Sequence, residues 1–244
     1  MHGNPPPWPA RPALFLDFDG TLLEIAEEPG LVAPSDRLRA LLPELGPACG
    51  GAVAVISGRP IAEIDRLLAP HRFPAAGIHG LERRDALGSV RSAAADSVAL
   101  ASARAALEPF VAAHPKLLLE DKERALALHY RRRPDLAEEV RRVVSTLEAA
   151  LPPELEVLPG RMVYEIKPRA TSKGAAIREF MRESPFAGRT PLYIGDDVTD
   201  EAGFAAVNEL GGVSVKVGAG RTTARFRLDG VGAVLGWLER SVLG

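Results

Sequence analysis

LFLDFDGTL, residues 14–22, joins a short apolar run to two carboxylates. The run from Ala13 to Asp17 has no polar alternation, which is typical of a strand buried on both faces in a parallel sheet. Asp17 and Asp19 lie two residues apart, and Gly20 follows them. Ligands of open α/β sheets bind just beyond the carboxyl ends of the strands. The stretch therefore predicts a parallel sheet with a reactive pair of carboxylates at its edge.

The first third of the chain alternates strands with helices. Apolar runs predict strands at residues 52–56 and 75–78, and Pro60 suits the first turn of a helix. Leucines recur at helical spacing behind a cap at Ser35 or Asp36. This order of elements is typical of a parallel α/β sheet.

The middle of the chain has a different order. A long alanine-rich helix is predicted over residues 93–113, then a hairpin around 121–123, a helix over 136–147, and strands near 155–158 and 162–166. Helix, hairpin, helix and hairpin together predict a compact α+β insert.

The alternation of strands and helices returns from Ser172. A helix runs to about Arg182, strands are predicted at residues 191–194 and 213–217, and a helix from Thr199 lies between these strands. The outer thirds therefore predict an α/β fold, a doubly wound, mostly parallel Rossmann-like sheet with an inserted α+β cap domain.

These patterns predict three regions. We expect residues 1–12 to form a flexible proline-rich leader, 13–84 with 168–244 to form the catalytic core, and 85–167 to form the cap domain for substrate recognition.

Composition excludes several classes of function. The chain has 30 lysines and arginines against 32 aspartates and glutamates, so it has no basic excess to attract a nucleic acid. No apolar stretch reaches the roughly 18 residues of a membrane span, and the leader lacks the apolar run of a signal peptide. The single Cys49 cannot form an internal disulfide, which fits a reducing compartment. We expect a cytoplasmic monomer with a small-molecule substrate and with no nucleic-acid or membrane partner.

Two further motifs lie at predicted strand and helix ends and offer hydrogen-bond donors and positive charge to a phosphoryl group. In VISGR, residues 55–59, the Ser57 hydroxyl and the Gly58 amide can bind a phosphoryl oxygen, and Arg59 can reach the substrate. In TSKGAAI, residues 171–177, Lys173 adds an ammonium group to the amides of a helix N-terminus. Taken alone, VISGR also fits an ordinary turn, and Lys173 also fits a solvated charge on the surface.

The stretch GDDVTDE, residues 195–201, brings Asp196, Asp197 and Asp200 within one turn. Carboxylates this close repel one another unless a cation or hydrogen-bond donors hold them, and oxygen ligands suit Mg²⁺. An acidic helix cap explains one of the three without a metal, most easily Asp200.

In this order, the four motifs resemble those of the haloacid dehalogenase superfamily. The resemblance implies that Asp17 is the nucleophile, which forms an aspartyl-phosphate, and that Asp19 is the general acid and base. It also implies that Ser57 and Lys173 bind the phosphate, with Lys173 as the catalytic lysine of the third motif.

The same resemblance implies a Mg²⁺ site. The metal would be held by the side chains of Asp17 and Asp196 and by the backbone carbonyl of Asp19, with Asp197 and Asp200 in support.

Further stretches resemble trehalose-6-phosphate phosphatases, which act in trehalose biosynthesis. These stretches are AGIHGLERR (76–84), LLEDKERALALHYR (118–131), VYEIKPRATSKGAA (163–176), GDDVTDEAGF (195–204) and VGAGRTTARFRL (217–228). The resemblance implies a Rossmann-like core with its cap between the second and third motifs, and a sugar phosphate as the substrate.

A disaccharide phosphate presents many hydroxyl groups, which carboxylates and long donors can bind. The resemblance implies that residues of the cap and the core bind the sugar: Glu120, Lys122, Arg131, Glu165, Arg59, His79 and Glu82. His129 fits the same chemistry, although it also fits the edge of the cap sheet. The charged residues 120–123 also fit a solvated hairpin tip. We expect the cap to close over the site and exclude water.

Two alternatives stay open. The first is a phosphatase of the same superfamily that acts on sucrose 6-phosphate, a phosphorylated glycerate glycoside or a sugar monophosphate. The second is a catalytically silent sensor of sugar phosphates, which would have no need for Asp17, Asp19, Lys173 and Asp196 together.

Overall fold

The computed structural model describes residues 6–25, 32–92, 97–160, 162–169 and 171–243. The chain divides into two compact units, which we call the core unit (Met1–Ser92 with Ser172–Gly244) and the cap unit (Ala93–Thr171).

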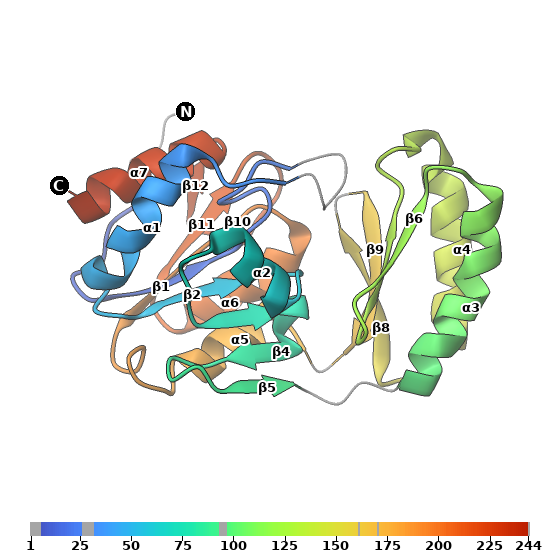
Figure 1. The fold of residues 1–244 in the computed structure, drawn as a ribbon, viewed down its shortest axis with the longest axis horizontal. Coiled ribbons are helices and arrows are strands. Elements are labelled where there is room, and N and C mark those ends of the chain that lie inside the picture. Colours follow the sequence, from blue (N-terminus) through green and yellow to red (C-terminus); the bar gives the residue numbers. More distant parts are fainter. Residues whose placement is uncertain (1–5, 26–31, 93–96, 161, 170, 244) are drawn as a thin grey trace. The chain divides into compact units, whose positions relative to one another are not determined.

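The division falls later along the chain than the predicted boundaries after residues 84 and 167. The reason at the first boundary is a pair of strands, β4 (Glu82–Arg84) and β5 (Val90–Ser92), which extend the sheet of the core unit by antiparallel pairing (Figure 1).

The core unit is built on a sheet whose described strands have the order β12-β11-β10-β1-β2-β3-β4-β5. The other strands are β1 (Pro12–Leu16), β2 (Val53–Ile56), β3 (Ala75–Gly77), β10 (Thr190–Gly195), β11 (Val213–Val217) and β12 (Phe226–Leu228). All pairs from β12 to β3 are parallel. The predicted doubly wound, mostly parallel sheet is confirmed. Its central strands β10, β1 and β2 end at the same edge, where the predicted site residues begin.

Helices cover both faces of this sheet. They are α1 (Asp36–Ala48), α2 (Ile61–Leu68), α5 (Lys173–Phe180), α6 (Glu201–Glu209) and α7 (Val231–Leu243). None of the helices in the described part of the chain is long and apolar enough to cross a lipid bilayer.

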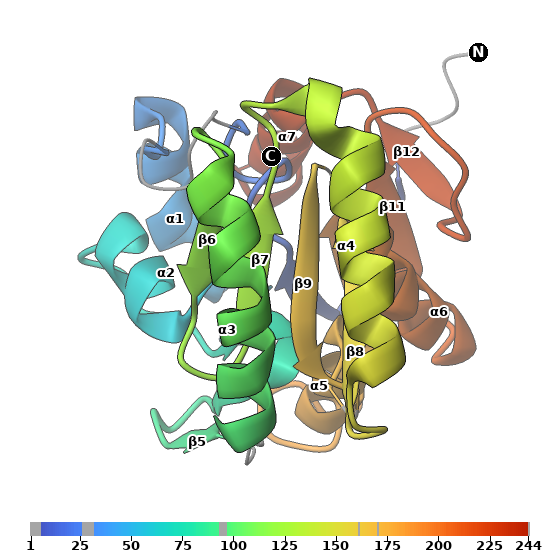
Figure 2. The ribbon, with the colours of Figure 1, turned by 90° about the vertical axis from the view of Figure 1, so that its right-hand side faces the viewer.

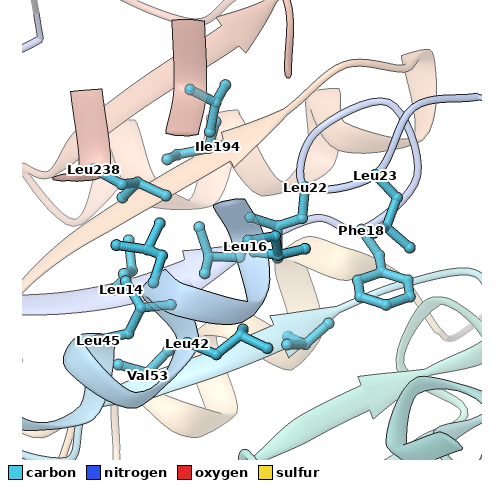
Figure 3. Packing of buried hydrophobic residues seen from close by; sticks show 14 of the residues in the cluster. Leu14, Leu16, Phe18, Leu22, Leu23, Leu42, Leu45, Val53, Ile194 and Leu238 are labelled. Atoms are coloured by element: carbon cyan, nitrogen blue, oxygen red, sulfur yellow. The ribbon is translucent and has the colours of Figure 1, made fainter. Parts of the chain in front are cut away.

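The strand β1 is buried on both sides because its residues alternate between two apolar clusters. Leu14 and Leu16 pack with residues of α1, α2 and α7 on one face, which Figure 3 shows around Leu42, Leu45 and Leu238. Ala13 and Phe15 pack with residues of α5 and α6 on the other face. Burying a large apolar side chain stabilises a fold by about 1.5–3 kcal/mol, so both clusters hold β1, and with it the start of the site, in place.

The cap unit is an antiparallel sheet with two helices on one face, as Figure 2 shows. The sheet has the order β6-β7-β9-β8 in the described residues. Its elements are α3 (Ser97–Ala113), β6 (Leu118–Asp121), β7 (Leu126–His129), α4 (Ala137–Ala150), β8 (Leu155–Gly160) and β9 (Val163–Pro168). Residues 93–96, where the predicted first helix begins, lie outside the described residues. The predicted order of helix, hairpin, helix and hairpin is confirmed.

Successive side chains along the cap strands point to opposite faces of the cap sheet, which separates apolar from polar residues. Leu126, Leu128 and Ile166 pack with α3 and α4 in the apolar cluster of the cap. The neighbours in register on the opposite face are Glu120, Ala127 and Glu165. The face away from the helices therefore carries the polar residues of the sugar-binding prediction.

The described part of the leader packs against α7, unlike the flexible segment that its composition predicts. The Trp8 ring lies 5.5 Å from the Trp237 ring, and the Trp237 indole N–H donates to the Pro6 carbonyl over 3.0 Å. An aromatic pair buries much apolar area, which offsets the entropy cost of ordering a proline-rich segment.

The close contact between α5 and α6 predicts that a methyl group added at Gly174 destabilises the fold. Gly174, the second residue of α5, has no room for one, because a Cβ atom would lie within 2.8 Å of the Ala202 carbonyl group of α6. We expect Gly174→Ala to lower the free energy of unfolding by about 1–3 kcal/mol, since backbone must move to admit it. Urea unfolding measures the change.

The matched control is Gly232, the second residue of α7, where an added Cβ atom has nothing within 4 Å. Here Gly232→Ala should raise the free energy of unfolding by up to about 0.5–1 kcal/mol through helix propensity. Equal effects of the two substitutions would contradict this account of the contact.

Candidate active site

Asp17, the predicted nucleophile, lies directly after β1 at the carboxyl edge of the sheet. Its backbone N–H donates to the Ile194 carbonyl of β10 over 3.0 Å, which fixes it to the neighbouring strand. Its side chain is 5% exposed. Oδ1 accepts a hydrogen bond from Lys173 Nζ at 2.6 Å, and Oδ2 accepts one from the Thr21 hydroxyl at 3.1 Å. The carboxylate is therefore buried and held by a cation and a hydroxyl group.

The loop after Asp17 lies so close to Asp196, in the turn after β10, that position 20 requires a glycine. Gly20 has a φ of +81°, and a Cβ atom there would lie within 2.7 Å of both carboxylate oxygens of Asp196. A larger residue would strain the backbone and push Asp196 away.

Lys173 joins the two halves of the core unit. It is the first residue of α5, whose N-cap Ser172 accepts a 3.1 Å hydrogen bond from the Ala175 N–H. Its ammonium group donates over 2.6 Å to Asp17 Oδ1 and over 2.6 Å to Asp200 Oδ1. One buried cation thus bridges two buried carboxylates.

Asp200 is fully buried and accepts hydrogen bonds from several groups. The Tyr193 hydroxyl donates to Oδ1 together with Lys173, and the Asp197 N–H donates to Oδ2 over 2.8 Å. The last bond is half of a capping box at the turn Val198–Asp200. The N-cap residue of this turn is Asp197, and Asp200 supplies the return bond of the capping box from its third position, which is only one of the contacts of this carboxylate.

Burial and repulsion from neighbouring carboxylates raise the pKa values of Asp17 and Asp196. Burial raises the pKa of Asp17 well above 3.8, Asp200 raises it further, and Lys173 opposes both. Burial, followed by Asp200, raises the pKa of Asp196 to about 6. Burial acts to lower the pKa of Lys173, but Asp17 and Asp200 together raise it, so the lysine stays charged. The site holds more negative charge than its lysine compensates.

The donor set fits a hard divalent cation. Asp17, Asp196 and Asp200 each offer a carboxylate oxygen, and these atoms all lie within 4.8 Å of one another. Oxygen ligands suit Mg²⁺, and a cation relieves the repulsion that raises the pKa values. Because Lys173, Tyr193 and the Asp197 N–H occupy Asp200, this residue suits a supporting role better than direct ligation.

Asp19, the predicted acid and base, forms an ion pair with Arg59. Arg59 Nε donates to Oδ2 over 2.6 Å and Nη2 donates to Oδ1 over 2.8 Å. The Asp19 side chain is 35% exposed. To give a proton to a leaving group, Asp19 has to release Arg59, which also contacts Glu63 at 3.1 Å.

Ser57 and Gly58 lie after β2, which is next to β1 in the sheet. Ser57 is buried, its N–H donates to the Ala76 carbonyl over 2.8 Å, and its hydroxyl accepts the Arg59 N–H over 3.1 Å. The fold therefore brings the ends of β1, β2 and β10 and the start of α5 to one edge, with the predicted core residues at these four places.

A backbone turn after β3 holds the Ser57 loop. Ile78, His79 and Gly80 have φ values of 46°, 54° and 99°. The Ile78 N–H donates to the Arg59 carbonyl over 3.0 Å and the His79 N–H donates to the Ser57 carbonyl over 2.9 Å. A positive φ is strained for isoleucine, so this turn is maintained by its contacts with the predicted phosphate loop.

Glu82 has a structural contact that the sequence did not indicate. Its Oε2 accepts the Ile61 N–H over 2.8 Å and so serves the first turn of α2. The predicted sugar-site role of Glu82 would compete with this bond.

Four of the predicted sugar-binding residues of the cap unit form two hydrogen-bonded pairs on its helix-free face. Glu120 Oε2 lies 2.8 Å from His129 Nε2, and Lys122 Nζ donates to Glu165 Oε1 over 2.7 Å. Burial acts to raise the pKa of Glu120, but His129 and Lys122 outweigh it, so the pKa is lowered and the carboxylate stays charged. Arg131 follows β7, two residues after His129.

Three residues of the site were not predicted: Thr21, Tyr193 and Lys216. Lys216 is buried in β11 and donates to the Asp196 carbonyl. Tyr193 sits in an apolar strand, where it reads as a core residue. The signal for Lys216 was present, because VSVKV sets one charge in an otherwise buried strand, which is unusual without a partner.

Comparisons with known proteins show the family of this chain. The family model described as trehalose-phosphatase matches residues 15–231. The chain is 45% identical over 230 residues to the trehalose-6-phosphate phosphatase of Escherichia coli strain K12, covering 94% of this chain and 86% of that protein. It is 44% identical over 206 residues to the probable trehalose-phosphate phosphatase of Sinorhizobium fredii, covering 84% and 77%.

Among solved structures, the C-terminal domain of the C. albicans trehalose-6-phosphate phosphatase matches with a TM-score of 0.87. The match covers 96% of this chain and 92% of that one at 24% identity, and it shows a common fold. The family predicted from the sequence motifs is confirmed.

The raised pKa of Asp196 predicts how stability depends on pH without a metal. The folded carboxyl holds its proton up to about pH 6, whereas the unfolded one has a pKa of 3.8. The folded state therefore binds more protons between these values, and stability falls as the pH rises through them. In EDTA near pH 7.5, Asp196→Asn should raise the free energy of unfolding by about 1–3 kcal/mol, since one pKa unit corresponds to about 1.4 kcal/mol.

Urea unfolding at two pH values checks this prediction, because the gain should vanish near pH 4. The exposed Asp229 serves as the control, and Asp229→Asn should change stability little at either pH. An Asp196→Asn protein that is no more stable than the wild type near pH 7.5 would show that folding does not raise the pKa of Asp196.

Proposed function

The chain belongs to the trehalose-phosphatase family, and we propose that it hydrolyses trehalose 6-phosphate to trehalose and phosphate with Asp17 as the nucleophile. The observation that carries this proposal is the buried Asp17 carboxylate, bound to Lys173 at the point where β1, β10 and α5 meet. A carboxylate in this position can attack phosphorus and form an aspartyl-phosphate, which water then cleaves.

Lys173 aligns the nucleophile and favours its charged form. Its ammonium group stays within 2.6 Å of Asp17, and this opposes the effect of burial on the carboxylate. When the phosphate ester approaches, the same ammonium group attracts the equatorial oxygens. We propose that the Ser57 hydroxyl and the Gly58 N–H donate to these oxygens as well.

Asp19 is the proton carrier in this proposal. It protonates the sugar oxygen as the ester bond breaks, and later it removes a proton from the attacking water. Its ion pair with Arg59 must open first. Opening of this ion pair would couple substrate binding to proton transfer. When the Arg59 guanidinium group turns to the sugar or the phosphate, it releases Asp19.

The acidic cluster would hold Mg²⁺ through the side chains of Asp17 and Asp196 and the backbone carbonyl of Asp19. Asp197 and Asp200 would support these ligands through the turn that they cap. Bound there, Mg²⁺ supplies positive charge to the phosphate oxygens and lowers the repulsion between Asp17 and an anionic substrate.

The sugar is bound by long polar side chains in this proposal. Those of the cap unit are Glu120, Lys122, His129, Arg131 and Glu165, and those of the core unit are Arg59 and His79. The pairs Glu120–His129 and Lys122–Glu165 support the proposal, because paired acceptors and donors can exchange partners with vicinal hydroxyls without leaving a charge unpaired. We also propose that the enzyme acts as a cytoplasmic monomer. Its single cysteine, a buried free thiol, fits a reducing compartment.

Replacement of the nucleophile gives the first test. Asp17→Asn should keep the fold but lower kcat by at least about 10³-fold, because the amide cannot form the acyl phosphate. Phosphate release from trehalose 6-phosphate measures the loss, with Asp229→Asn as the control. Substantial turnover by the folded Asp17→Asn protein would exclude this mechanism, and binding of the ester without turnover by the wild type would favour a sensor.

A substrate panel tests the identity of the sugar. Trehalose 6-phosphate should exceed sucrose 6-phosphate and glucose 6-phosphate in kcat/KM by at least about tenfold, because each missing or misplaced hydroxyl leaves a polar side chain unpaired. The same panel in EDTA should show no turnover, and added Mg²⁺ should restore it. A preference for the monosaccharide ester would overturn the assignment of the substrate.

A further inference from the structure

Lys216 is a buried cation that no step of the proposed reaction uses. It lies in β11, where Val213, Val215 and Val217 face the apolar cluster of α1 and α7. Ser214 and Lys216 point to the opposite face, and Lys216 is 5% exposed. Burying an ammonium group costs several kcal/mol unless hydrogen bonds compensate for the lost water, so the contacts of this group need an explanation.

The Lys216 ammonium group binds two backbone carbonyls at the edge that carries the site. It donates to the Asp196 carbonyl and, over 3.0 Å, to the Val217 carbonyl. Parallel pairing of β10 with β11 sets Lys216 opposite Gly195, one residue before Asp196. The lysine therefore links the end of β11 to the first residue of the acidic turn.

The peptide group between Asp196 and Asp197 is held at both ends. Its carbonyl accepts from Lys216, and its N–H, that of Asp197, donates to Asp200 Oδ2 over 2.8 Å. Because a peptide group is planar, two such contacts fix the orientation of the whole unit. Asp200 in turn accepts from Lys173, which also donates to Asp17, so one chain of hydrogen bonds runs from Lys216 through this peptide to the nucleophile.

Small movements of this peptide would displace the Asp196 carboxylate. Asp196 lies against Gly20, where even one methyl group would come within 2.7 Å of both of its carboxylate oxygens. Rotation of the peptide would therefore drive the carboxylate into the loop of Asp17 or away from it.

We propose that Lys216 is a positioning residue, which fixes the peptide between Asp196 and Asp197 and thereby holds the Asp196 carboxylate in the orientation that binds a divalent cation. The proposal rests on the proposed function for the use of a metal. Lys216 does not contact the metal or the substrate. It acts through the backbone, in the way that outer groups orient metal ligands elsewhere.

The test is direct titration of Mn²⁺ as a probe, by calorimetry or by electron paramagnetic resonance, on the full chain. Lys216→Met keeps the length of the side chain and removes the donors. We expect the Kd for Mn²⁺ to rise about 10–100-fold, as is typical when a group that orients a metal ligand is lost. The Mg²⁺ concentration for half-maximal activity should rise in parallel, whereas kcat at saturating Mg²⁺ and KM for trehalose 6-phosphate should stay within about threefold of the wild type.

The matched control is Ser214→Ala, on the same face of the same strand. The Ser214 hydroxyl donates to Asn208 over 2.7 Å and accepts the Arg225 N–H over 3.0 Å. Its loss should lower the melting temperature and leave the Kd for Mn²⁺ unchanged. Lys216→Gln, which is shorter and neutral, repeats the titration if the methionine variant does not fold.

The outcomes distinguish the positioning role of Lys216 from the metal dependence of the proposed reaction. If the wild type binds Mn²⁺ and both lysine variants bind it equally well, the positioning role is wrong, even when their melting temperatures fall. If the wild type neither binds Mn²⁺ nor needs Mg²⁺ for turnover, the metal dependence in the proposed function is wrong instead.

Discussion

The ammonium group of Lys173, held between Asp17 and Asp200, is the contact on which the site is built. All three side chains are buried, with 5% or less exposed. Two carboxylates buried this close cannot both stay ionised without a cation, and a buried lysine cannot stay charged without its acids. The contact requires the end of β1, the start of α5 and the turn after β10 to meet at one point. The parallel order of β10 and β1 meets this requirement.

The remaining excess of negative charge explains the other features of the site. Lys173 compensates one carboxylate, while Asp17, Asp196, Asp197 and Asp200 are all drawn into the same region. Hydrogen-bond donors of the fold reduce the repulsion between these carboxylates. The Tyr193 hydroxyl donates to Asp200, and the Lys216 ammonium group donates to the Asp196 carbonyl. A divalent cation would complete the compensation. Stability and catalysis oppose each other here, because the charges that bind a metal destabilise the protein without it.

The ion pair between Asp19 and Arg59 bears on how the proposed acid becomes free to act. In the structure the predicted acid is engaged by a guanidinium group on the adjacent loop. The same arginine is the one that the sequence assigns to the substrate. Both assignments hold if the arginine changes partners on substrate binding, so that the acid is released only when an ester is present.

The sequence by itself determined the parallel sheet and the α+β insert, and it predicted which residues serve as the proposed nucleophile, acid and lysine. These depend on local signals, namely apolar runs without alternation, helical spacing, and polar residues directly after strands. Only the tertiary structure decided the partners of these residues. Lys173 meets a carboxylate 156 positions away, Arg59 takes Asp19, Glu82 serves α2, and Lys216 reaches the Asp196 carbonyl. Such pairings depend on the distances between strand ends. These distances are set by the order and register of the strands, which no single stretch of the chain determines.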